Sequence, residues 1–441
     1  MYSNSLNTKQ ILAESLYLQG KNLFITGPAG VGKTFLIKHL ISLSLHTGKK
    51  VAVTALTGCA AFLIGGKTIH SWSGIGLGKQ PVEKLISRIK NNKRNKFTWL
   101  RTQVLVIDEI SMMTAELLEK LEQIARKIKN NNLPFGGIQI VFLGDFCQLP
   151  PIEKDKGGFC FESHLWNELF DQTIYLDEIM RQSDPVFQEI LNKIRLGVCD
   201  ENCIESLNTC LYPQKKYNSL ENEDIEHKII PTKLFTLNQD VNSKKDFMLK
   251  RLKTKVHKFN AKTEKIKNDL DEDLTLGQIE KIEEFMDKNG NYMKDLKLAI
   301  GCQVVLLINM DTELGLVNGA RGIVTGFSSS NDPIVKFNNG EIKIIEKYNW
   351  IYEENENQLI ERIQYPLKLA WAISIHKSQG MSMDLVEIDI GESIFEYGQS
   401  YVALSRVKTL EGLYISKFQP KNIKINPLVK DYYNKLSNEE C

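Results

Sequence analysis

The sequence has few cysteines, no long apolar run and almost no net charge, and each absence narrows the possible functions. Eight cysteines in 441 residues are too few for a scaffold held together by disulfides. The longest aliphatic run, Val304–Ile308, has five residues, whereas a membrane-spanning helix needs roughly 18 or more. We therefore expect no membrane partner. The 56 basic and 54 acidic residues nearly cancel, so global charge identifies no partner.

What remains is the composition of an ordinary soluble protein, with 42% hydrophobic and 25% charged residues. At roughly 150 residues per domain, a chain of 441 residues is expected to contain more than one core. The first twenty residues hold one lysine, no apolar segment and no arginine-rich pattern, which predicts an intracellular protein of the cytoplasm, nucleoid or nucleus.

Local charge is more informative than global charge. The segment 79–101 holds eight basic residues and one acidic residue, and the segment 244–267 holds ten and two. Such runs are most often solvated surfaces, but they are also candidate contacts with a polyanion. The cysteine cluster Cys199, Cys203 and Cys210 lacks the spacing of a zinc site, which favours small buried residues over metal ligands.

Short apolar runs alternate with helical stretches in the first third of the chain. These runs have the length of buried strands and lie at 23–26, 51–55, 104–107 and 138–143. The pattern predicts the α/β class, a parallel sheet with crossover helices. A second set of runs predicts a second α/β lobe and lies at 233–236, 304–308, 385–390 and 413–415. Between them, the charged stretch 244–292 is expected to be helical or mobile, and 319–345 indicates hairpins or a small barrel.

A glycine-rich loop follows the first of these runs, and a helical stretch follows the loop. It reads Gly27-Pro28-Ala29-Gly30-Val31-Gly32-Lys33-Thr34, which is the P-loop pattern in its required context. Glycines let backbone N–H groups turn toward phosphates, a lysine at this place reaches the β and γ oxygens, and the following hydroxyl ligates Mg²⁺. The sequence therefore predicts a nucleoside triphosphate and Mg²⁺ at this loop.

Two further strand ends carry polar groups suited to hydrolysis. Asp108 and Glu109 follow the third run, where Asp108 is suited to hold Mg²⁺ and Glu109 to polarise an attacking water. Gln148 follows the fourth run in Gly144-Asp145-Phe146-Cys147-Gln148, where its amide can sense the γ-phosphate. Because parallel strands present their C-terminal ends at one edge of the sheet, we expect these groups at a common edge.

At this point the chain resembles a known family. The segment Glu119–Ile128, followed by Pro134-Phe135-Gly136-Gly137-Ile138-Gln139, resembles the signature of the Pif-type DNA helicases, a branch of helicase superfamily one related to RecD. It lies between Asp108-Glu109 and Gly144-Asp145, as in that family. The resemblance continues through most of the chain and is weakest between Lys244 and Tyr292.

The resemblance implies roles for further residues. Gln10 matches the glutamine that reads adenine, and Arg181 and Arg406 match arginine fingers that close on the γ-phosphate. Gln379 and Gly380 belong to a nucleotide-contacting motif of the second lobe. The residues implied in DNA binding are Thr57, Gly58, His70, Trp72, Thr236, Asn238, Ser374, His376 and Lys377. Without the resemblance, Trp72 and His376 would more often be buried core residues than DNA contacts. Arginines such as Arg181 and Arg406 more often form surface salt bridges than act as fingers.

The resemblance also implies an architecture. Two RecA-like lobes are expected, the first at 1–178 with a basic wedge insertion near 79–101, the second at 179–245 and 361–441. Residues 246–360 would form an accessory region that includes a small SH3-like β-barrel.

The implied function is that of an ATP-dependent DNA helicase acting on single-stranded, forked or structured DNA with 5′–3′ polarity. A role in genome maintenance and a monomeric state are expected by analogy. The alternative is a nucleotide-gated DNA clamp or recruitment module that does not unwind. A clamp of that kind needs neither Arg406 nor the segment around His376, so these residues favour the motor.

Overall fold

The computed structural model describes residues 6–151, 158–211, 230–265, 275–290, 292–311, 313–355 and 358–439. The chain divides into two units, and each is described by itself. The first comprises Met1–Glu201, Phe395–Ser405 and Pro420–Cys441, and the second comprises Asn202–Ile394 and Arg406–Gln419. The two C-terminal segments, Phe395–Ser405 and Pro420–Cys441, thus belong to the same unit as the N-terminal part of the chain.

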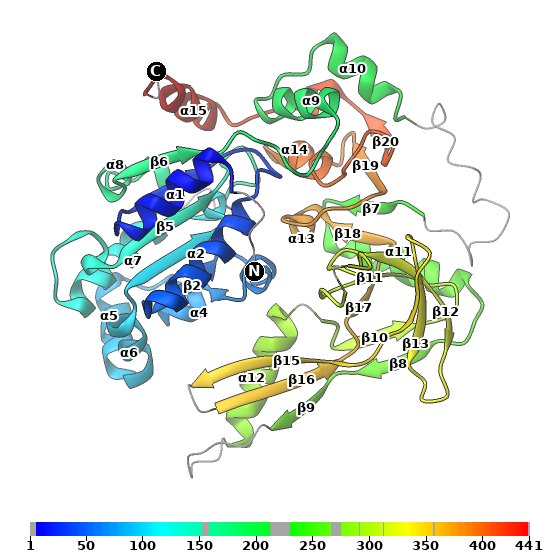
Figure 1. Ribbon diagram of the computed structural model, residues 1–441, viewed down its shortest axis with the longest axis horizontal. Helices are drawn as coiled ribbons and strands as arrows, with labels where there is room; N and C mark the ends of the chain where they lie inside the picture. The colour runs from blue at the N-terminus through cyan, green and yellow to red at the C-terminus, as the bar shows by residue number, and fades with distance from the viewer. Residues whose placement is uncertain are drawn as a thin grey trace. The chain divides into compact units, whose positions relative to one another are not determined.

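The first unit is built on a sheet of six parallel strands (Figure 1). In spatial order they are β3 (Lys67–Thr68), β2 (Val51–Ala55), β4 (Val104–Asp108), β5 (Gln139–Gly144), β1 (Leu23–Thr26) and β6 (Gln172–Tyr175). The four runs expected as strands in this part of the chain are β1, β2, β4 and β5, so that prediction is confirmed.

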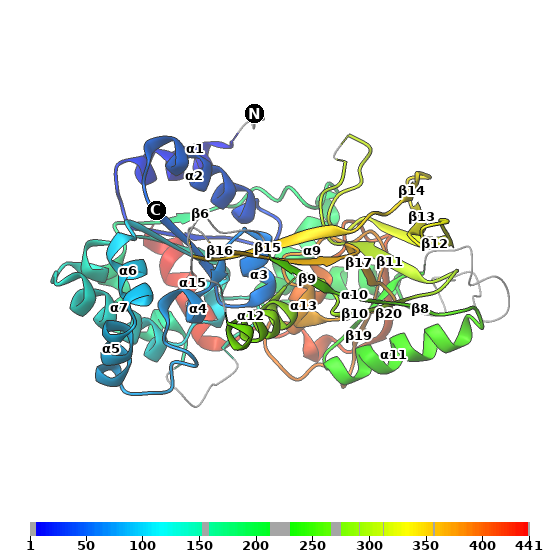
Figure 2. The same ribbon diagram turned by 90° about the horizontal axis from the view of Figure 1, so that it is seen from below.

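The helices of the first unit cover the two faces of this sheet or pack beside it. They are α1 (Thr8–Leu18), α2 (Lys33–Thr47), α3 (Gly58–Leu63), α4 (Ile69–Ser73), α5 (Val82–Asn91), α6 (Lys93–Arg101), α7 (Ala115–Lys129), α8 (Trp166–Leu169), α9 (Pro185–Arg195), α14 (Gln399–Leu404) and α15 (Pro427–Glu439). Figure 2 shows α1 and α2 on one face and α7 and α15 on the other.

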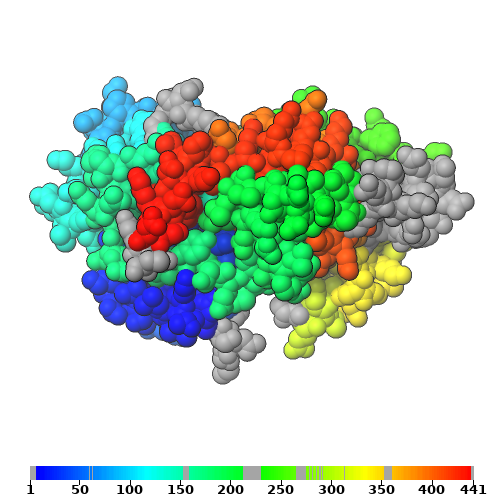
Figure 3. Space-filling view, turned by 90° about the horizontal axis from the view of Figure 1, so that it is seen from above, coloured from blue at the N-terminus to red at the C-terminus, as the bar shows by residue number. Residues whose placement is uncertain are grey.

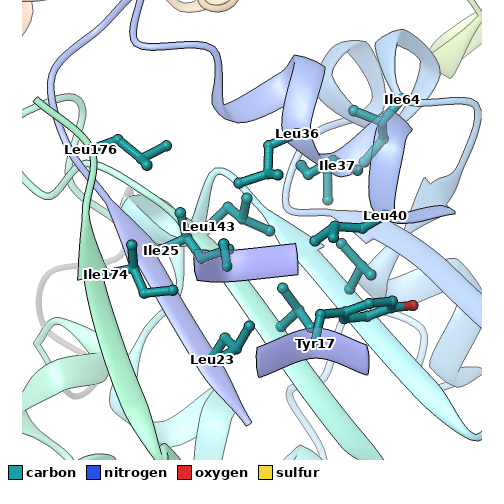
Figure 4. Close-up of a cluster of buried hydrophobic side chains, with 14 of the residues drawn as sticks. Tyr17, Leu23, Ile25, Leu36, Ile37, Leu40, Ile64, Leu143, Ile174 and Leu176 are labelled. Carbon is teal, nitrogen blue, oxygen red and sulfur yellow. The ribbon is translucent and has the colours of Figure 1, made fainter. Parts of the chain in front are cut away.

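The alternation of side chains along β1 explains why both faces are covered. Leu23 and Ile25 point into the core beneath α1 and α2, where they meet Leu36, Leu40 and other buried apolar side chains (Figure 4). Phe24 points to the opposite face, into an aromatic cluster that includes Trp166 at a ring distance of 5.0 Å. With both faces buried, the strands read as continuous apolar runs, which is why they could be found in the sequence.

The second unit contains a parallel sheet of four strands. In spatial order these are β18 (Ala372–Ser374), β7 (Thr232–Phe235), β19 (Val386–Ile390) and β20 (Leu413–Phe418). Its helices are α10 (Glu201–Asn208), which begins at the unit boundary, α11 (Asn238–Arg251), α12 (Leu276–Asn289) and α13 (Ile375–Ser378). The α/β class and the second parallel sheet are thus confirmed.

The rest of the second unit is antiparallel. A five-stranded sheet has the order β14 (Ile342–Ile344), β13 (Pro333–Phe337), β12 (Arg321–Phe327), β11 (Gln303–Leu306) and β17 (Leu367–Leu369). A three-stranded sheet joins β15 (Tyr348–Asn355), β16 (Gln358–Gln364) and β9 (Lys262–Lys265), and a two-stranded sheet joins β10 (Asp295–Leu298) and β8 (His257–Asn260).

Three expectations for this region need correction. The run 304–308, expected in the second α/β lobe, supplies β11 of the antiparallel sheet. The stretch 244–292 holds the strands β8 and β9 as well as helices, and its residues 266–274 and 291 lie outside the described part. The expected barrel is not confirmed, because β14 and β17 are the opposite ends of the five-stranded order and no pairing joins them among the described residues. Among those residues, no helix is both long and apolar enough to cross a membrane.

Candidate active site

The glycine-rich loop connects β1 to α2 at the C-terminal edge of the six-stranded sheet. Gly27, Gly30 and Gly32 have φ angles of 143°, 89° and 84°, which L side chains rarely adopt. A Cβ on Gly27 would also lie 2.0 Å from the carbonyl oxygen of Leu176. Gly32 caps the 15-residue helix α2 without a side chain, so the first backbone N–H groups of the helix are suited to bind an anion.

The side chain of Lys33 folds back over this loop. Its ammonium donates hydrogen bonds to the carbonyl oxygens of Gly27 at 2.7 Å and Pro28 at 2.8 Å. Burial lowers the pKa of Lys33, and the negative charges of Asp145, Glu109 and Asp108 oppose that effect. The ammonium is therefore held among carbonyls and carboxylates, a setting that favours exchange of the carbonyls for phosphate oxygens.

Asp108 and Glu109 lie where β4 ends. Asp108 is 5% exposed, and burial together with the adjacent charge of Glu109 raises its pKa to about 7, against the opposing effects of a backbone hydrogen bond and of Lys33. The backbone N–H of Glu109 donates to Asp108 Oδ1 at 2.8 Å. Glu109 has a left-handed backbone, with φ at 55°, which costs a non-glycine residue about 1 to 3 kcal/mol. Such strain at a polar strand end is typical of a functional site.

The residues present fit a Mg²⁺ ion. Mg²⁺ usually binds one or two carboxylates together with substrate phosphates and waters rather than a cage of protein ligands. Asp108 supplies one carboxylate and Thr34 supplies a hydroxyl in the first turn of α2. The raised pKa of Asp108 fits as well, since a bound cation would favour its ionised form.

Gln148 lies in a tight turn after β5. The Gln148 backbone N–H donates to the Asp145 carbonyl oxygen at 3.0 Å, and the residue is 5% exposed. A Cβ on Gly398 would lie 2.3 Å from the Gln148 carbonyl oxygen, so the chain preceding α14 packs directly on this turn. The packing leaves little freedom for the backbone that carries Gln148.

Arg181 lies beside the P-loop. The backbone N–H of Met180 donates to the Gly30 carbonyl oxygen at 2.9 Å, and a Cβ on Gly30 would lie 2.8 Å from Arg181 Cβ. Arg181 Nη1 donates to the Ser405 carbonyl oxygen at 3.0 Å. Burial lowers the pKa of this guanidinium, and the negative charge of Glu109 opposes that effect, so it stays a cation at neutral pH. The structure thus brings a partly buried positive charge to the loop.

Gln10 packs against the other side of the loop. It is 3% exposed, and its Nε2 donates to the Val31 carbonyl oxygen at 3.4 Å. Its Oε1 accepts from the Asn7 backbone N–H at 3.2 Å, as part of the capping box of α1. The side chain is therefore held next to the loop, although no contact with a base can be read from these bonds.

Three sequence-predicted nucleotide residues lie in the second unit. Arg406 is 1% exposed, and its Nη1 lies 3.5 Å from the carbonyl oxygens of Ser378 and Met381. Gln379 is 8% exposed and Gly380 has φ at 78°. Arg406 is therefore a buried cation that joins the two second-unit motifs to each other, and its role at the nucleotide stays a prediction.

The predicted DNA contacts of the first unit lie on and around α3 and α4. Thr57 Oγ1 accepts from the Ala60 backbone N–H at 3.2 Å at the start of α3, next to Gly58. Burial lowers the pKa of His70. Trp72 is 8% exposed and packs on Trp99 with ring centroids 4.4 Å apart, so much of its ring is covered by core.

The predicted DNA contacts of the second unit cluster at the ends of β7 and β18. Thr236 follows β7, and Asn238, which is exposed, begins α11. Ser374 ends β18, is 1% exposed, and its Oγ has no hydrogen-bond partner among the described residues. His376 and the exposed Lys377 lie in α13, directly after β18. Because β7 and β18 are parallel neighbours, these residues share one sheet edge.

The basic segment 79–101 forms the helices α5 and α6. Leu85, Ile89 and Trp99 are fully buried, and Trp99 Nε1 donates to the Ser73 carbonyl oxygen at 2.9 Å. Lys84, Arg88, Lys90, Lys93 and Lys96 are among its exposed basic residues. The insertion is thus anchored by its apolar side and carries its charge on the outside. Of the cysteine cluster, Cys203 and Cys210 are buried, as expected for small core residues.

Comparison with known proteins identifies the family. The family PIF1-like helicase matches residues 5–204, and the family DNA helicase Pif1, 2B domain matches residues 283–327. The crystal structure of Pif1 helicase from Candida albicans is 36% identical, with a TM-score of 0.74, and covers 98% of this chain and 100% of that one. The chain belongs to the Pif1 helicase family.

Two further relatives extend the comparison. Bacteroides sp Pif1, whose structure is a complex with ADP-AlF4, is 29% identical with a TM-score of 0.80, over 99% of this chain and 98% of that one. The ATP-dependent DNA helicase PIF1 of Danio rerio is 39% identical over 99% of this chain. The match covers 65% of the Danio rerio protein, so this chain spans about two thirds of that relative's length.

Two features of this Pif1 family member were missed in the sequence. A buried ion pair joins Asp145, which is fully buried, to Arg195 Nη2 at 2.8 Å. Tyr401 places its hydroxyl oxygen 2.7 Å from the Ala29 backbone nitrogen, where it accepts a hydrogen bond from the P-loop. Asp145 stood in a recognised motif, but nothing local in the sequence connects it to Arg195 or connects Tyr401 to Ala29.

Proposed function

We propose that this chain is an ATP-dependent DNA helicase that translocates 5′–3′ along single-stranded DNA and unwinds forked or structured duplexes. The observation that carries the proposal lies in the first unit. There the P-loop lysine, the Asp108–Glu109 pair and the Arg181 side chain lie close to the same loop and strand end: Glu109 acts on the pKa of Lys33, of Asp108 and of Arg181, and Arg181 Cβ packs against Gly30. An edge of this composition can bind a triphosphate, activate a water and neutralise the charge that develops during hydrolysis.

Each residue contributes a separate step to hydrolysis. Lys33 releases the carbonyl oxygens of Gly27 and Pro28 and binds the β and γ oxygens of ATP. Glu109 orients and polarises the attacking water from a strained backbone that fixes its direction. Gln148, held in the turn after β5, senses the γ-phosphate through its amide. Gln10 reads the adenine.

A bound Mg²⁺ would supply neutralisation of the negative charge on the phosphates. Thr34 and Asp108 are the residues that would hold it. Asp108 must then be ionised, so cation binding at pH values below about 7 releases a proton from its carboxyl group.

Two arginines complete the charge compensation. Arg181 acts from beside the P-loop, and Arg406 is proposed to act from the second RecA-like lobe when the lobes close on ATP. Hydrolysis then couples lobe closure to a step along the strand. Gln379 and Gly380 contribute to the nucleotide side of the second lobe.

Single-stranded DNA is the proposed track. Bacteroides Pif1 has been solved bound to single-stranded DNA, and another related structure concerns unwinding at forked duplex DNA by two coordinating Pif1 helicases. In this chain the contacts would come from the residues around α3, α4, α11 and α13, with the basic α5–α6 insertion as a wedge. Polarity, a monomeric working state, an intracellular location and genome maintenance in replication, repair, recombination or at telomeres belong to the same proposal.

Lys33→Ala tests the assignment of the nucleotide site. We expect DNA-stimulated ATP hydrolysis to fall by about 10²- to 10³-fold, because the ammonium that stabilises the transferring phosphoryl group is lost. Single-strand affinity without nucleotide should remain within about threefold of the parent protein. Steady-state ATPase assays and fluorescence anisotropy with a labelled oligonucleotide measure the two quantities. Turnover at the parental rate in Lys33→Ala would refute the site.

A further inference from the structure

The C-terminal helix α15 brings one hydroxyl group to the strand ends that flank the P-loop. Tyr433 is 5% exposed, and its hydroxyl oxygen lies 2.7 Å from Thr26 Oγ1, 3.1 Å from the Phe146 backbone nitrogen and 3.2 Å from Asp145 Oδ1. Thr26 is the last residue of β1, directly before Gly27. Asp145 and Phe146 directly follow β5, the strand paired with β1.

The hydrogen-bonding capacity of the four groups fits a single arrangement. A phenol donates one proton and accepts two, and an ionised carboxylate only accepts. The Phe146 N–H therefore donates to the Tyr433 oxygen, Tyr433 donates to Asp145 Oδ1, and the Thr26 hydroxyl donates to the Tyr433 oxygen. All polar capacity of this phenol is used between β1 and the turn after β5.

A buried ion pair fixes the position of the phenol. Arg195 Nε donates to Asp145 Oδ2 at 3.0 Å, and the Arg195 guanidinium lies 4.6 Å from the centre of the Tyr433 ring. Burial by itself would raise the pKa of Asp145, but Arg195 holds it below its usual value, so this carboxylate is ionised at neutral pH. Its charge in turn acts on the ammonium of Lys33, whose pKa it raises against the effect of burial.

The helix α15 carries a second phenol next to Tyr433. Figure 3 shows the helix, in red, at the surface of the first unit. Tyr432 packs in the same aromatic cluster, with its ring 5.4 Å from Phe146, and its hydroxyl accepts from Trp166 Nε1 at 3.2 Å. Adjacent residues of one helix therefore offer two phenols with different partners.

We propose that Tyr433 is a positioning residue of the ATPase site, which makes α15 part of that site. Its hydroxyl ties the residue before the P-loop to the turn that carries Gln148 and sets their spacing. The proposal rests on the proposed ATPase function. Because the P-loop and α2 still bind the triphosphate without this bond, its loss acts on turnover and not on ATP binding.

Tyr433→Phe tests the proposal, with Tyr432→Phe as the matched control. The first variant keeps the ring over Arg195 and removes only the hydroxyl. We expect kcat for DNA-stimulated ATP hydrolysis to fall by about tenfold, as for loss of a bond to a charged group, while KM for ATP stays within about threefold. Tyr432→Phe should retain kcat within about twofold. Equal kcat in both phenylalanine variants overturns the proposal.

A double-mutant cycle and an exchange measurement separate positioning from general loss of stability. Thr26→Val removes the strand-side hydroxyl, and if both variants break one link, the double variant should be no slower than Tyr433→Phe alone. Amide hydrogen exchange in segment 144–149 should be about tenfold faster in Tyr433→Phe than in Tyr432→Phe, since the Phe146 N–H loses its acceptor. Fully additive losses of kcat, or unchanged exchange, contradict the link.

These readouts also distinguish the proposal from the proposed function. A parent protein without ATPase activity refutes the function, and the exchange of the Phe146 amide then decides whether the Tyr433 contact exists. A parent protein with ATPase activity that Tyr433→Phe leaves unchanged keeps the function and refutes the role of Tyr433.

Discussion

Replacing Arg181 with alanine is expected to lower DNA-stimulated ATP turnover by about 10³- to 10⁵-fold, the effect of losing an arginine finger in other phosphoryl-transfer systems. Arg181 packs beside Gly30 in a partly buried place where its guanidinium keeps its charge, so solvent screens it less than at an exposed site. ATP binding depends on the P-loop and α2 and should change by less than about tenfold. Single-turnover hydrolysis and equilibrium binding of a fluorescent ATP analogue measure the two effects.

Gln182→Ala is the control for Arg181→Ala. Gln182 Nε2 donates to the same Ser405 carbonyl oxygen, at 3.3 Å, but carries no charge. If Arg181 acted only by holding Ser405, both substitutions would slow hydrolysis to a similar extent. We expect a loss of less than about tenfold for Gln182→Ala. Comparable losses in the two variants would contradict a finger role.

Asp108→Asn is expected to make the nucleotide-free protein more stable while it removes most of the activity. The neutral amide binds Mg²⁺ more weakly than the carboxylate, and loss of metal-based charge stabilisation should lower turnover by at least about 10²- to 10³-fold, since it is worth several kcal/mol. In return, the buried negative charge beside Glu109 disappears. ATPase assays and thermal melts in the absence of nucleotide measure the two changes.

The raised pKa of Asp108 makes the free energy of unfolding depend on pH. Its folded pKa of about 7 lies above the ordinary value of 3.8, so between these pH values the folded protein binds a proton that the unfolded chain has lost. The contribution of Asp108 to the free energy of unfolding therefore falls as pH rises from about 4 to 7, by up to about 4 kcal/mol. Above about pH 7 this contribution no longer changes. In Asp108→Asn this decrease in the free energy of unfolding should be absent. Urea unfolding at several pH values measures the free energy of unfolding of both proteins. If it changes with pH in the same way in the parent protein and in Asp108→Asn, the raised pKa is contradicted.

Sequence reasoning succeeded where the signal is local. The P-loop depends on a strand, glycines and a helix start within a few residues, and Gly27, Gly30 and Gly32 indeed need the left-handed backbone. The strand ends Asp108 and Gln148 could be placed because parallel strands share an edge, and that sheet is present. The P-loop context and the Asp108 strand end could thus be derived without tertiary information.

It failed where partners are distant in sequence. Tyr401 and Tyr433 contact Ala29 and Thr26 across more than 370 residues, and no periodicity encodes such a pairing. The run 304–308 is as apolar as a buried strand of a parallel sheet, but it pairs with β12 and β17 in antiparallel orientation. The direction of a neighbouring strand is set by the tertiary fold and leaves no mark on the hydrophobic pattern of the run. The packing of Trp99 on Trp72 likewise depends on the tertiary fold and could not be predicted from the sequence around either residue.

The most direct test of the helicase proposal is strand displacement with two partial duplexes that differ only in the side of their single-stranded tail. The proposal predicts that ATP and Mg²⁺ release the labelled strand from the 5′-tailed duplex and not from the 3′-tailed one, and that Lys33→Ala releases neither. ATP-dependent binding of both substrates without displacement would contradict the motor and support a nucleotide-gated clamp.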